Sequence, residues 1–386
     1  MIQRKYLTLP SQSFFLFGAR GTGKSSWLKS QLTHHNAWYI DLLDPEEEDR
    51  FRQRPKTLEN EYLAMKKKPK WIVLDEVQRV PKLLDLAHRM IENYKVKFAL
   101  SGSSARKLKR GGSNLLAGRA FVNYLFPLTY QELGKKFDLE SILKWGSLPK
   151  LLSLKGNEKE KYLRAYALVY LNEEIRAEQI VRNLEPFREF LRISAQHNGK
   201  ILNYANISKD VGSDIKTIQS YFQILEDTWM GFHLPAYHES IRKAQRQRPK
   251  FFWFDVGVKR ALEQTLDMIP KSGTSYYGDC FEHFIIAEVF RLNHYLERDF
   301  RLAYFETQNS NAEIDLVLSK GRRRPIVIEI KSTEKINEVE VTALERLAKD
   351  FNPEKIYYLS RSDKAQNIGS VLCRPWKAGL DEIFGL

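Results

Sequence analysis

The segment that most constrains this chain of 386 residues is Gly18-Ala19-Arg20-Gly21-Thr22-Gly23-Lys24-Ser25. It follows an apolar run, Phe14–Phe17, that is typical of a buried strand, and it opens a helical pattern that continues to Thr33. A glycine-rich loop between a strand and a helix can wrap its backbone N–H groups around phosphate oxygens. The segment therefore predicts a phosphate-binding loop at the start of an α/β domain.

Each residue of this loop has an expected role toward ATP and Mg²⁺. We expect the Lys24 ammonium to neutralise the β- and γ-phosphates and the Ser25 hydroxyl to bind Mg²⁺. The other expected nucleotide contacts are Gly18, Arg20, Gly21, Thr22, Gly23 and Ser26. A glycine-rich loop without a ligand is the alternative, and the Lys-Ser pair with a downstream acidic pair favours nucleotide binding.

The downstream acidic pair is Asp75-Glu76, which ends the apolar run Trp71–Leu74. Carboxylates at the tip of a buried strand are costly unless they hold a cation. We expect Asp75 to act in the Mg²⁺ site and Glu76 to polarise the water that attacks the γ-phosphate. An ordinary acid pair at a turn is the alternative.

Two further positions are candidates for the same site. Ser103 follows the strand pattern Lys97–Leu100, and its hydroxyl could reach the γ-phosphate or the attacking water; a polar turn is the alternative. Arg119 precedes the last strand pattern, where an arginine could stabilise phosphate charge in a neighbouring subunit. That role needs a homo-oligomer, such as a ring, and a surface arginine is the alternative.

Short runs that are apolar on both faces predict a central parallel sheet over residues 1–130. Residues 131–185 have helical patterns typical of a linker or lid. Residues 186–260 contain three short helical patterns followed by an apolar stretch, as in a winged helix. Residues 261–386 predict a further α/β domain in the order α-β-β-β-α-β.

The middle region carries the candidate nucleic-acid contacts. The chain has a net charge of +14, from 62 basic and 48 acidic residues, which favours a polyanionic partner such as DNA. Lys216 and Gln219 should be exposed on the third helix, Asp214–Leu225. The basic run Arg242–Lys250 should extend toward DNA phosphates through Arg242, Lys243, Arg246 and Arg248. A domain that packs on a protein instead is the alternative.

Two carboxylates and a lysine are spaced for a second active site near the C-terminus. Asp315 and Glu329 lie on successive strand patterns, so their carboxylates could converge on Mg²⁺. Lys331 is two residues beyond Glu329 and points to the same strand face, where it could orient a hydroxide or stabilise the charged phosphorane. Glu282, on the preceding helix, is a further candidate ligand. Ordinary salt bridges between strands are the alternative.

The chain resembles the AAA+ ATPases of bacteria and archaea that carry a nuclease-like C-terminal domain of unassigned function. The strings that carry the resemblance include FLFGARGTGKS, WIVLDEVQ, FALSGSS, LLAGRA, WGSLP, FFWFDVGV, AEIDLVL and IVIEIKS. It implies a P-loop NTPase sheet, then a helical and winged-helix region, then an α/β domain similar to the PD-(D/E)xK nuclease fold. It also implies Ser103 or Ser104 as a sensor hydroxyl and Arg119 as an arginine finger.

Composition excludes several classes of protein. No apolar run approaches the ~18 residues of a spanning helix, and the N-terminus lacks the apolar region of a secretory signal. Two cysteines do not make a disulfide framework, so we expect a cytoplasmic protein without a membrane partner. The expected function is ATP-driven binding and remodelling of DNA, including branched DNA, with Mg²⁺-dependent DNA cleavage left open. The alternative is a nucleotide-dependent switch that engages a protein and carries an inert nuclease-like module.

Overall fold

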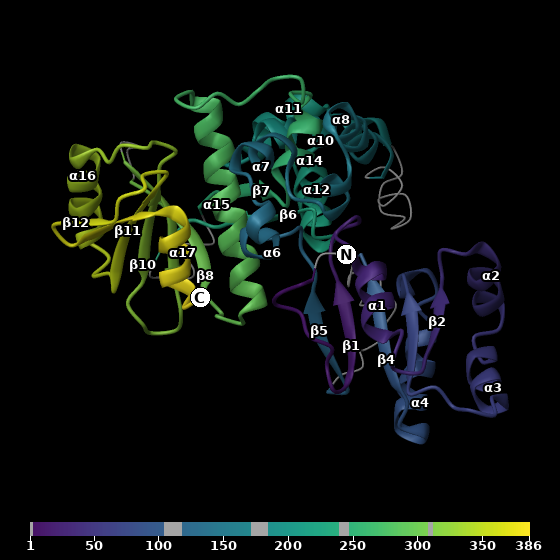
Figure 1. Ribbon diagram of the computed structural model, residues 1–386. Coiled ribbons are helices and arrows are strands. Elements are labelled where there is room, and N and C mark those ends of the chain that lie inside the picture. Colours follow the sequence, from purple (N-terminus) through teal and green to yellow (C-terminus); the bar gives the residue numbers. More distant parts are fainter. Residues whose placement is uncertain (1–2, 104–117, 171–183, 239–246, 308–311) are drawn as a thin grey trace. The chain divides into compact units, whose positions relative to one another are not determined.

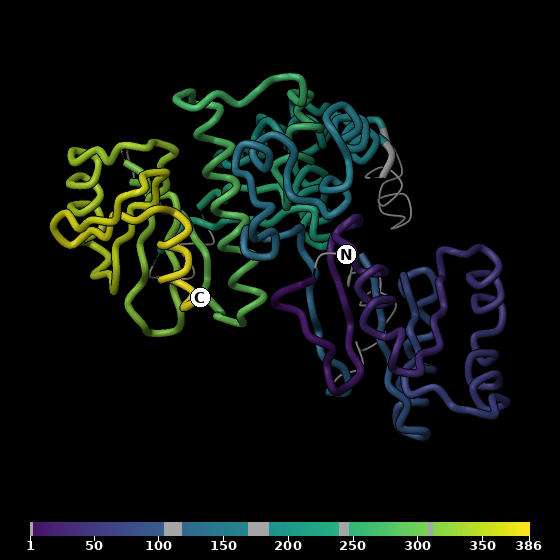
Figure 2. The backbone as a smooth tube through the Cα atoms, viewed as in Figure 1, coloured from purple at the N-terminus to yellow at the C-terminus, as the bar shows by residue number. Residues whose placement is uncertain are grey.

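The computed structural model describes residues 3–103, 118–170, 184–238, 247–307 and 312–386. The chain divides into two compact units (Figures 1 and 2). The first consists of Met1–Leu128, Leu148–Lys150 and Gln223–Met230, and the second of Thr129–Ser147, Leu151–Phe222 and Gly231–Leu386. The expected division at residues 130, 185 and 260 stays a prediction.

The first unit is built on a five-stranded sheet in the order β2-β3-β4-β1-β5, in which every pair is parallel. This confirms the predicted parallel sheet. The strands are β1 (Ser13–Phe17), β2 (Ala37–Asp41), β3 (Trp71–Asp75), β4 (Lys97–Gly102) and β5 (Ala120–Tyr124). The helices are α1 (Lys24–Leu32), α2 (Pro45–Gln53), α3 (Thr57–Ala64), α4 (Leu83–Tyr94) and the short 3-10 helix η1 (Val77–Arg79).

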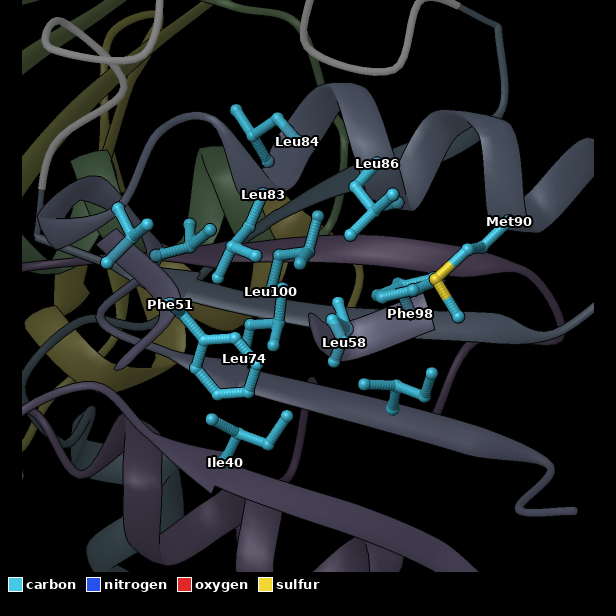
Figure 3. Close-up of a cluster of buried hydrophobic side chains, with 14 of the residues drawn as sticks. Ile40, Phe51, Leu58, Leu74, Leu83, Leu84, Leu86, Met90, Phe98 and Leu100 are labelled. Atoms are coloured by element: carbon cyan, nitrogen blue, oxygen red, sulfur yellow. The ribbon is translucent and has the colours of Figure 1, made fainter. Parts of the chain in front are cut away.

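Apolar side chains cover both faces of this sheet, as the unbroken apolar runs predict. On one face, Leu74 and Leu100 pack with residues of α2, α3 and α4, including Phe51 and Met90 (Figure 3). On the other face, Phe14 packs against Trp27 of α1 and against Trp71. Packed apolar side chains therefore hold the sheet between two cores.

The second unit begins with helical segments. They are α6 (Tyr130–Leu133), η2 (Gly134–Lys136), α7 (Leu139–Trp145), η3 (Pro149–Ser153, shared with the first unit), α8 (Gly156–Ala165) and η4 (Tyr166–Tyr170). Then follow α10 (Leu184–Gln196), α11 (Tyr204–Val211), α12 (Ile215–Asp227, which belongs to the first unit from Gln223 onward), the antiparallel pair β6 (Gly231–Leu234) and β7 (Lys250–Trp253), and α14 (Val256–Glu263). Three helices precede the strand pair, and the winged-helix assignment stays a prediction.

Two of the strings that carry the family resemblance pack against each other. Asp255 caps the N-terminus of α14, and its other oxygen accepts a hydrogen bond of 2.8 Å from the backbone N–H of Ser147. A Cβ added to Gly146 would lie 2.0 Å from the Asp255 carboxylate, and one added to Gly257 would lie 1.9 Å from the Trp145 carbonyl. Glycine is therefore required at both positions for this close approach.

A buried ion pair joins other parts of the same region. Glu288 and Arg291 lie one turn apart on α15 (Ser275–Tyr295), 2.8 Å apart, and both are almost fully buried. Glu288 also accepts from the backbone N–H of Tyr130, and Arg291 donates to the Phe254 carbonyl. Burial of the carboxylate raises the pKa of Glu288 to about 7. These polar groups are satisfied inside the unit, so their role is structural.

The C-terminal part of the second unit holds a six-stranded mixed sheet in the order β12-β13-β11-β10-β9-β8. After α15 come β8 (Arg301–Glu306), β9 (Glu313–Ser319), β10 (Ile326–Ile330), α16 (Glu338–Lys349), β11 (Lys355–Ser360), β12 (Gln366–Ile368), β13 (Val371–Pro375) and α17 (Trp376–Phe384). The predicted order α-β-β-β-α-β is present up to β11. The last two strands and α17 were not predicted, and a nuclease fold is not established.

The helices α16 and α17 cover opposite faces of this sheet. Tyr358 of β11 donates a hydrogen bond of 3.0 Å to Glu340 of α16. The next residue, Leu359, lies against Gly379 of α17, where an added Cβ would be 2.2 Å from its side chain. Successive residues of a strand point to opposite faces.

Within the described ranges, no helix is both long and apolar enough to cross a membrane.

Candidate functional site

The glycine-rich loop joins β1 to α1, as predicted. Gly21 and Gly23 have φ of 80° and 97°, a left-handed backbone that glycine adopts without steric cost. A Cβ on Gly18 would lie 2.1 Å from the carbonyl oxygen of Leu125, just beyond β5. Thr22 Oγ1 donates to the carbonyl of Ala19 at 2.9 Å and closes the turn. The loop therefore has the shape that a phosphate cradle needs.

Lys24 is the most informative side chain of the loop. It is only 4% exposed, and its ammonium donates to the carbonyl oxygens of Gly18 at 2.7 Å and Ala19 at 3.2 Å. No described carboxylate forms an ion pair with it. A buried cation held only by neutral carbonyls is costly unless an anion shares its site. This geometry fits a bound phosphate, with Gly18 to Gly23 around it. Arg20 and Ser25 are half-buried and Ser26 is exposed.

Asp75 is buried at the end of β3 and is held by two hydroxyl groups. Ser101 donates to Oδ1 and Tyr39, on β2, donates to Oδ2. Burial, and then the Asp75 charge, raise the pKa of Tyr39 well above its usual value, so the phenol remains a donor. The Ser25 hydroxyl lies close to the same phenol and opposes that shift. Asp75 and Ser25 thus lie near one another, as a Mg²⁺ site shared with phosphate oxygens requires.

Glu76 follows Asp75 in a left-handed conformation, with φ of 59° and ψ of 48°. Such a backbone is uncommon for a residue other than glycine and is often found at functional sites. Its N–H donates to Ser101 Oγ at 3.1 Å, and its carboxylate accepts from the side-chain amide of Gln78. The same amide lies 3.1 Å from Ser103 Oγ. Gln78 therefore connects the candidate base to the candidate sensor hydroxyl.

The strands β3, β4 and β1 are neighbours and parallel, so their carboxyl ends meet at one edge of the sheet. The candidate residues lie at these strand ends or in the segments that follow them: Lys24 after β1, Asp75 and Glu76 at the end of β3, and Ser103 after β4. A bound Mg²⁺ would supply charge stabilisation for the phosphates. Lys24 can hold the phosphate oxygens, and Glu76 can accept a proton from a water aimed at the γ-phosphate.

Arg119 lies at the other end of the sheet. It immediately precedes β5, whose Ala120 pairs with Ser13 and whose Tyr124 pairs with Phe17. The phosphate loop begins after Phe17, so about four residues of strand, roughly 13 Å, separate the two positions. Arg119 pairs with Glu92 of α4, and this bond lowers the pKa of Glu92. Arg119 therefore lies away from the phosphate loop of the same chain.

The C-terminal candidates Asp315, Glu329 and Lys331 lie close together. The antiparallel register of β9 and β10 pairs Leu316 with Ile328, so one step further Asp315 is opposite Glu329. Asp315 accepts a hydrogen bond of 2.7 Å from the N–H of Ile330, and Lys331 pairs with Oε1 of Glu329. The other oxygen, Oε2, is buried without a hydrogen-bond partner. Burial and the Asp315 charge raise the pKa of Glu329.

Glu282 joins this cluster from α15, together with a lysine that the sequence analysis did not assign to it. Lys250 is 5% exposed and pairs with Glu313, while Glu282 lies 3.9 Å away. Burial lowers the pKa of Lys250, but the Glu282 and Glu313 charges outweigh it and the net shift is upward. Burial and the Asp315 charge raise the pKa of Glu282. The expectation that the basic run reaches toward DNA up to Lys250 is wrong for Lys250.

Two lysines, Lys250 and Lys331, form ion pairs within the carboxylate cluster and so affect whether it can bind a metal ion. Across the described residues, no group of three or more His, Cys, Asp or Glu side chains is arranged to hold a metal ion. Lys250 and Lys331 supply the positive charge that a cation would otherwise supply. The orphaned Oε2 of Glu329 still offers a ligand atom. Binding of Mg²⁺ by Asp315 and Glu329 stays a prediction. It would require the ammonium groups of Lys250 and Lys331 to move away from the carboxylates.

The candidate DNA contacts are only partly described. Lys216 and Gln219 are exposed on α12, on the side away from the buried Ile218 and Phe222. Arg248 is exposed just before β7. Arg242, Lys243 and Arg246 lie outside the described residues, as does Ser104.

Four residues of the two sites were missed by the sequence analysis: Tyr39, Ser101, Gln78 and Lys250. Gln78 and Ser101 were within strings that were noted, but nothing in a string indicates which side chains touch. Tyr39 is in the middle of an edge strand, and only the parallel pairing of β2 with β3 brings it beside Asp75.

Family models cover three successive segments of the chain. Residues 10–134 match an AAA domain. Residues 136–268 and 277–378 match two domains of unknown function, DUF8612 and DUF4143. The boundary between the first two lies close to the end of the first sheet.

The curated relatives are uncharacterized proteins. Those of Mycobacterium bovis and Mycobacterium tuberculosis are each 26% identical over 270 residues, which is 68% of this chain and 58% of theirs. One of Haemophilus influenzae is 22% identical over 237 residues, or 57% of this chain and 58% of its own. This chain thus spans less than two thirds of the length of these relatives.

Among solved structures, the Walker-type ATPase of Pyrococcus abyssi is 14% identical, with a TM-score of 0.42, covering 64% of this chain and 90% of that one. Three observations indicate the same kind of domain: the match to the AAA family model, the parallel sheet, and the loop with its buried lysine. Residues 10–134 form a P-loop ATPase domain of the AAA kind.

Proposed function

We propose that this protein is a Mg²⁺-dependent ATPase that uses ATP hydrolysis to bind and remodel DNA. The observation that carries the ATPase part is the buried, carboxylate-free ammonium of Lys24 at the same sheet edge as Asp75 and Glu76. A bound phosphate would compensate the positive charge of Lys24. Glu76 is the proton acceptor at the same edge of the sheet.

The DNA part rests on charge. The chain has a net charge of +14, and the exposed face of α12 carries Lys216 and Gln219. A basic surface binds nucleic acid by releasing counterions, so affinity falls steeply with salt. Exposed helical residues of this kind can enter a groove or contact the backbone.

Steady-state ATP hydrolysis with and without DNA tests this proposal. We expect duplex, single-stranded or four-way-junction DNA to raise the rate several-fold at low salt. Lys216→Gln with Arg248→Gln should reduce both DNA affinity and the stimulation. The control Lys155→Gln with Lys161→Gln removes the same charge from exposed positions near α8. If no DNA form binds at low salt, the protein is better described as a nucleotide-dependent switch that engages a protein partner.

The active form is proposed to be a homo-oligomer in which Arg119 acts on a neighbouring subunit. The position of Arg119 at the sheet end remote from its own phosphate loop supports this. Arg119→Ala and Lys24→Ala proteins should each be inactive, and mixing them should restore part of the ATPase activity if subunits exchange. A protein that stays monomeric with and without ATP rules this out.

A second candidate function is Mg²⁺- or Mn²⁺-dependent cleavage of DNA by the C-terminal cluster. The observation that favours it is the orphaned Oε2 of Glu329, opposite Asp315 and beside Lys331. Cleavage by the wild type should be lost in Asp315→Asn and in Lys331→Met, while ATP hydrolysis continues. If no substrate is cut in either metal, branched junctions included, the domain is a binding or assembly module.

A further inference from the structure

The turn between β9 and β10 carries a run of three arginines, Arg322 to Arg324, that no part of the proposed function uses. Beside this turn the surface is hollowed by a pocket of about 150 Å³. That is several times the volume of about 30 Å³ that one water molecule occupies in the liquid. Phe300, Leu318 and Ile326 line part of the wall. The pocket is therefore large enough for a small hydrated group.

Four cationic side chains line this pocket: Lys320, Arg323, Arg324 and Lys355. Within the described ranges, Arg323, Arg324 and Lys355 have no ion-pair partner, whereas Lys320 lies 3.3 Å from Asp299. Two carboxylates, Glu354 and Glu382, also line it. Glu382 is already paired with Arg374 at 2.8 Å, which offsets its charge. The pocket is therefore positive and its arginines are available to an anion.

A buried hydroxyl also belongs to the pocket. Tyr357 of β11 is fully buried, and the Glu382 carboxylate lies near its hydroxyl group. Burial, and secondly that carboxylate, raise the pKa of Tyr357 to about 12. The phenol thus remains protonated at neutral pH. The pocket lining thus includes a protonated phenol, which could donate a hydrogen bond to an oxyanion.

The pocket is separate from the carboxylate cluster. On β9, Leu318 and Asp315 are three residues apart, so their side chains point to opposite faces of the sheet. The same holds on β10 for Ile326 and Glu329. The pocket is on the face covered by α17, to which Glu382 belongs.

We infer that this pocket binds a phosphate group. Arginine side chains bind phosphate through two parallel N–H donors, and a lysine adds a point charge. The phosphate could belong to the backbone of a nucleic acid or to a small phosphorylated molecule. The inference does not depend on the ATPase proposal.

Equilibrium dialysis with radiolabelled inorganic phosphate at low ionic strength tests the inference. The 386-residue chain is used with Lys24→Ala, which removes phosphate binding by the loop. Arg323→Gln with Arg324→Gln should weaken phosphate binding about tenfold or more, because two charge-assisted contacts are lost. The control Arg322→Gln with Arg346→Gln removes the same charge from exposed positions that do not line the pocket. Circular dichroism melting checks that each variant folds.

A short DNA duplex without terminal phosphates distinguishes the two sources. If the pocket variant also binds the duplex more weakly, with a flatter salt dependence than the control, the ligand is a backbone phosphate. If it loses inorganic phosphate and binds the duplex as the control does, the ligand is a small phosphorylated molecule. No phosphate binding in the Lys24→Ala protein, or an equal loss in both arginine pairs, would overturn the inference.

Discussion

The carboxylate of Glu76 accepts a hydrogen bond from the side-chain amide of Gln78, and the same amide lies 3.1 Å from Oγ of Ser103. The candidate base is thus oriented by a residue on η1 that also contacts the end of β4. Because Ser103 follows the strand next to the phosphate loop, a shift of this strand end on nucleotide binding would reach Glu76 through Gln78.

Replacing Gln78 with alanine should lower the kcat of ATP hydrolysis about tenfold and leave the KM for ATP nearly unchanged. The reason is that Glu76 loses its orientation, while the phosphate loop keeps its contacts. Steady-state kinetics checks this, with the exposed Gln53→Ala as control. A rise in KM with an unchanged kcat would show that Gln78 acts in binding instead.

Replacing Tyr39 with phenylalanine should raise the Mg²⁺ concentration needed for half-maximal ATPase activity by about three- to tenfold. The phenol donates to Asp75, and loss of such a supporting hydrogen bond lets the carboxylate turn away. A titration of Mg²⁺ at saturating ATP measures the effect. If wild type and Tyr39→Phe need the same Mg²⁺ concentration for half-maximal activity, Tyr39 does not support the Mg²⁺ site.

Replacing Gly18 with alanine should destabilise the protein by about 2 kcal/mol or more and abolish nucleotide binding. The new Cβ would lie 2.1 Å from the backbone oxygen of Leu125, where no flexible side chain can give way. Gly118→Ala is the control, since its φ is also positive, at 73°, but no described atom lies within 4 Å. In thermal unfolding, Gly18→Ala should have a clearly lower melting temperature than Gly118→Ala. Similar melting temperatures for the two variants would contradict the loop geometry.

His283 should make a contribution to the free energy of unfolding that is lost as pH falls. This side chain is buried beside the Trp253 carbonyl, and burial lowers its pKa to about 3 from an ordinary value near 6.5. The unfolded chain therefore binds a proton between pH 6.5 and 3 that the folded chain does not, so stability is lost as pH falls through this window. The raised pKa of Glu288 acts in the opposite direction over this window, so the His283 contribution is measured as the difference between wild type and His283→Gln in urea unfolding. From pH 7 to pH 5.5 wild type should lose about 1 kcal/mol of stability relative to His283→Gln. The same change with pH in both proteins would contradict the assignment.

The sequence predicted the ATPase sheet and the residues of the phosphate loop because their properties are local. Asp75 ends β3, and Gly21 and Lys24 lie in the loop and at the helix start that follow β1; the apolar runs in the sequence mark where these strands end. What pairs with these residues is not local. Tyr39 reaches Asp75 only through the pairing of β2 with β3, and Gln78 reaches Ser103 only because β3 and β4 are neighbours.

At the C-terminal site, too, the sequence predicted some residues and not the contacts that distant parts of the chain make with them. The sequence placed Asp315, Glu329 and Lys331 on adjacent strands, and they are together in the structure. It assigned Lys250 to an exposed basic run, because a charged residue in such a run is usually solvated. Instead, Lys250 is the first residue of β7 and is buried against Glu313 and Glu282. Only tertiary packing decides this, since β7 and β9 are far apart along the chain.

The most direct test of the account is release of radiolabelled phosphate from ATP under single-turnover conditions by wild type, Lys24→Ala and Glu76→Gln. Wild type should release phosphate only with Mg²⁺. Glu76→Gln should bind ATP as tightly as wild type and hydrolyse it about 100-fold more slowly, whereas Lys24→Ala should bind little ATP. Hydrolysis by Glu76→Gln at the wild-type rate would contradict the assignment of the base, and failure of the wild type to bind ATP would contradict the central claim.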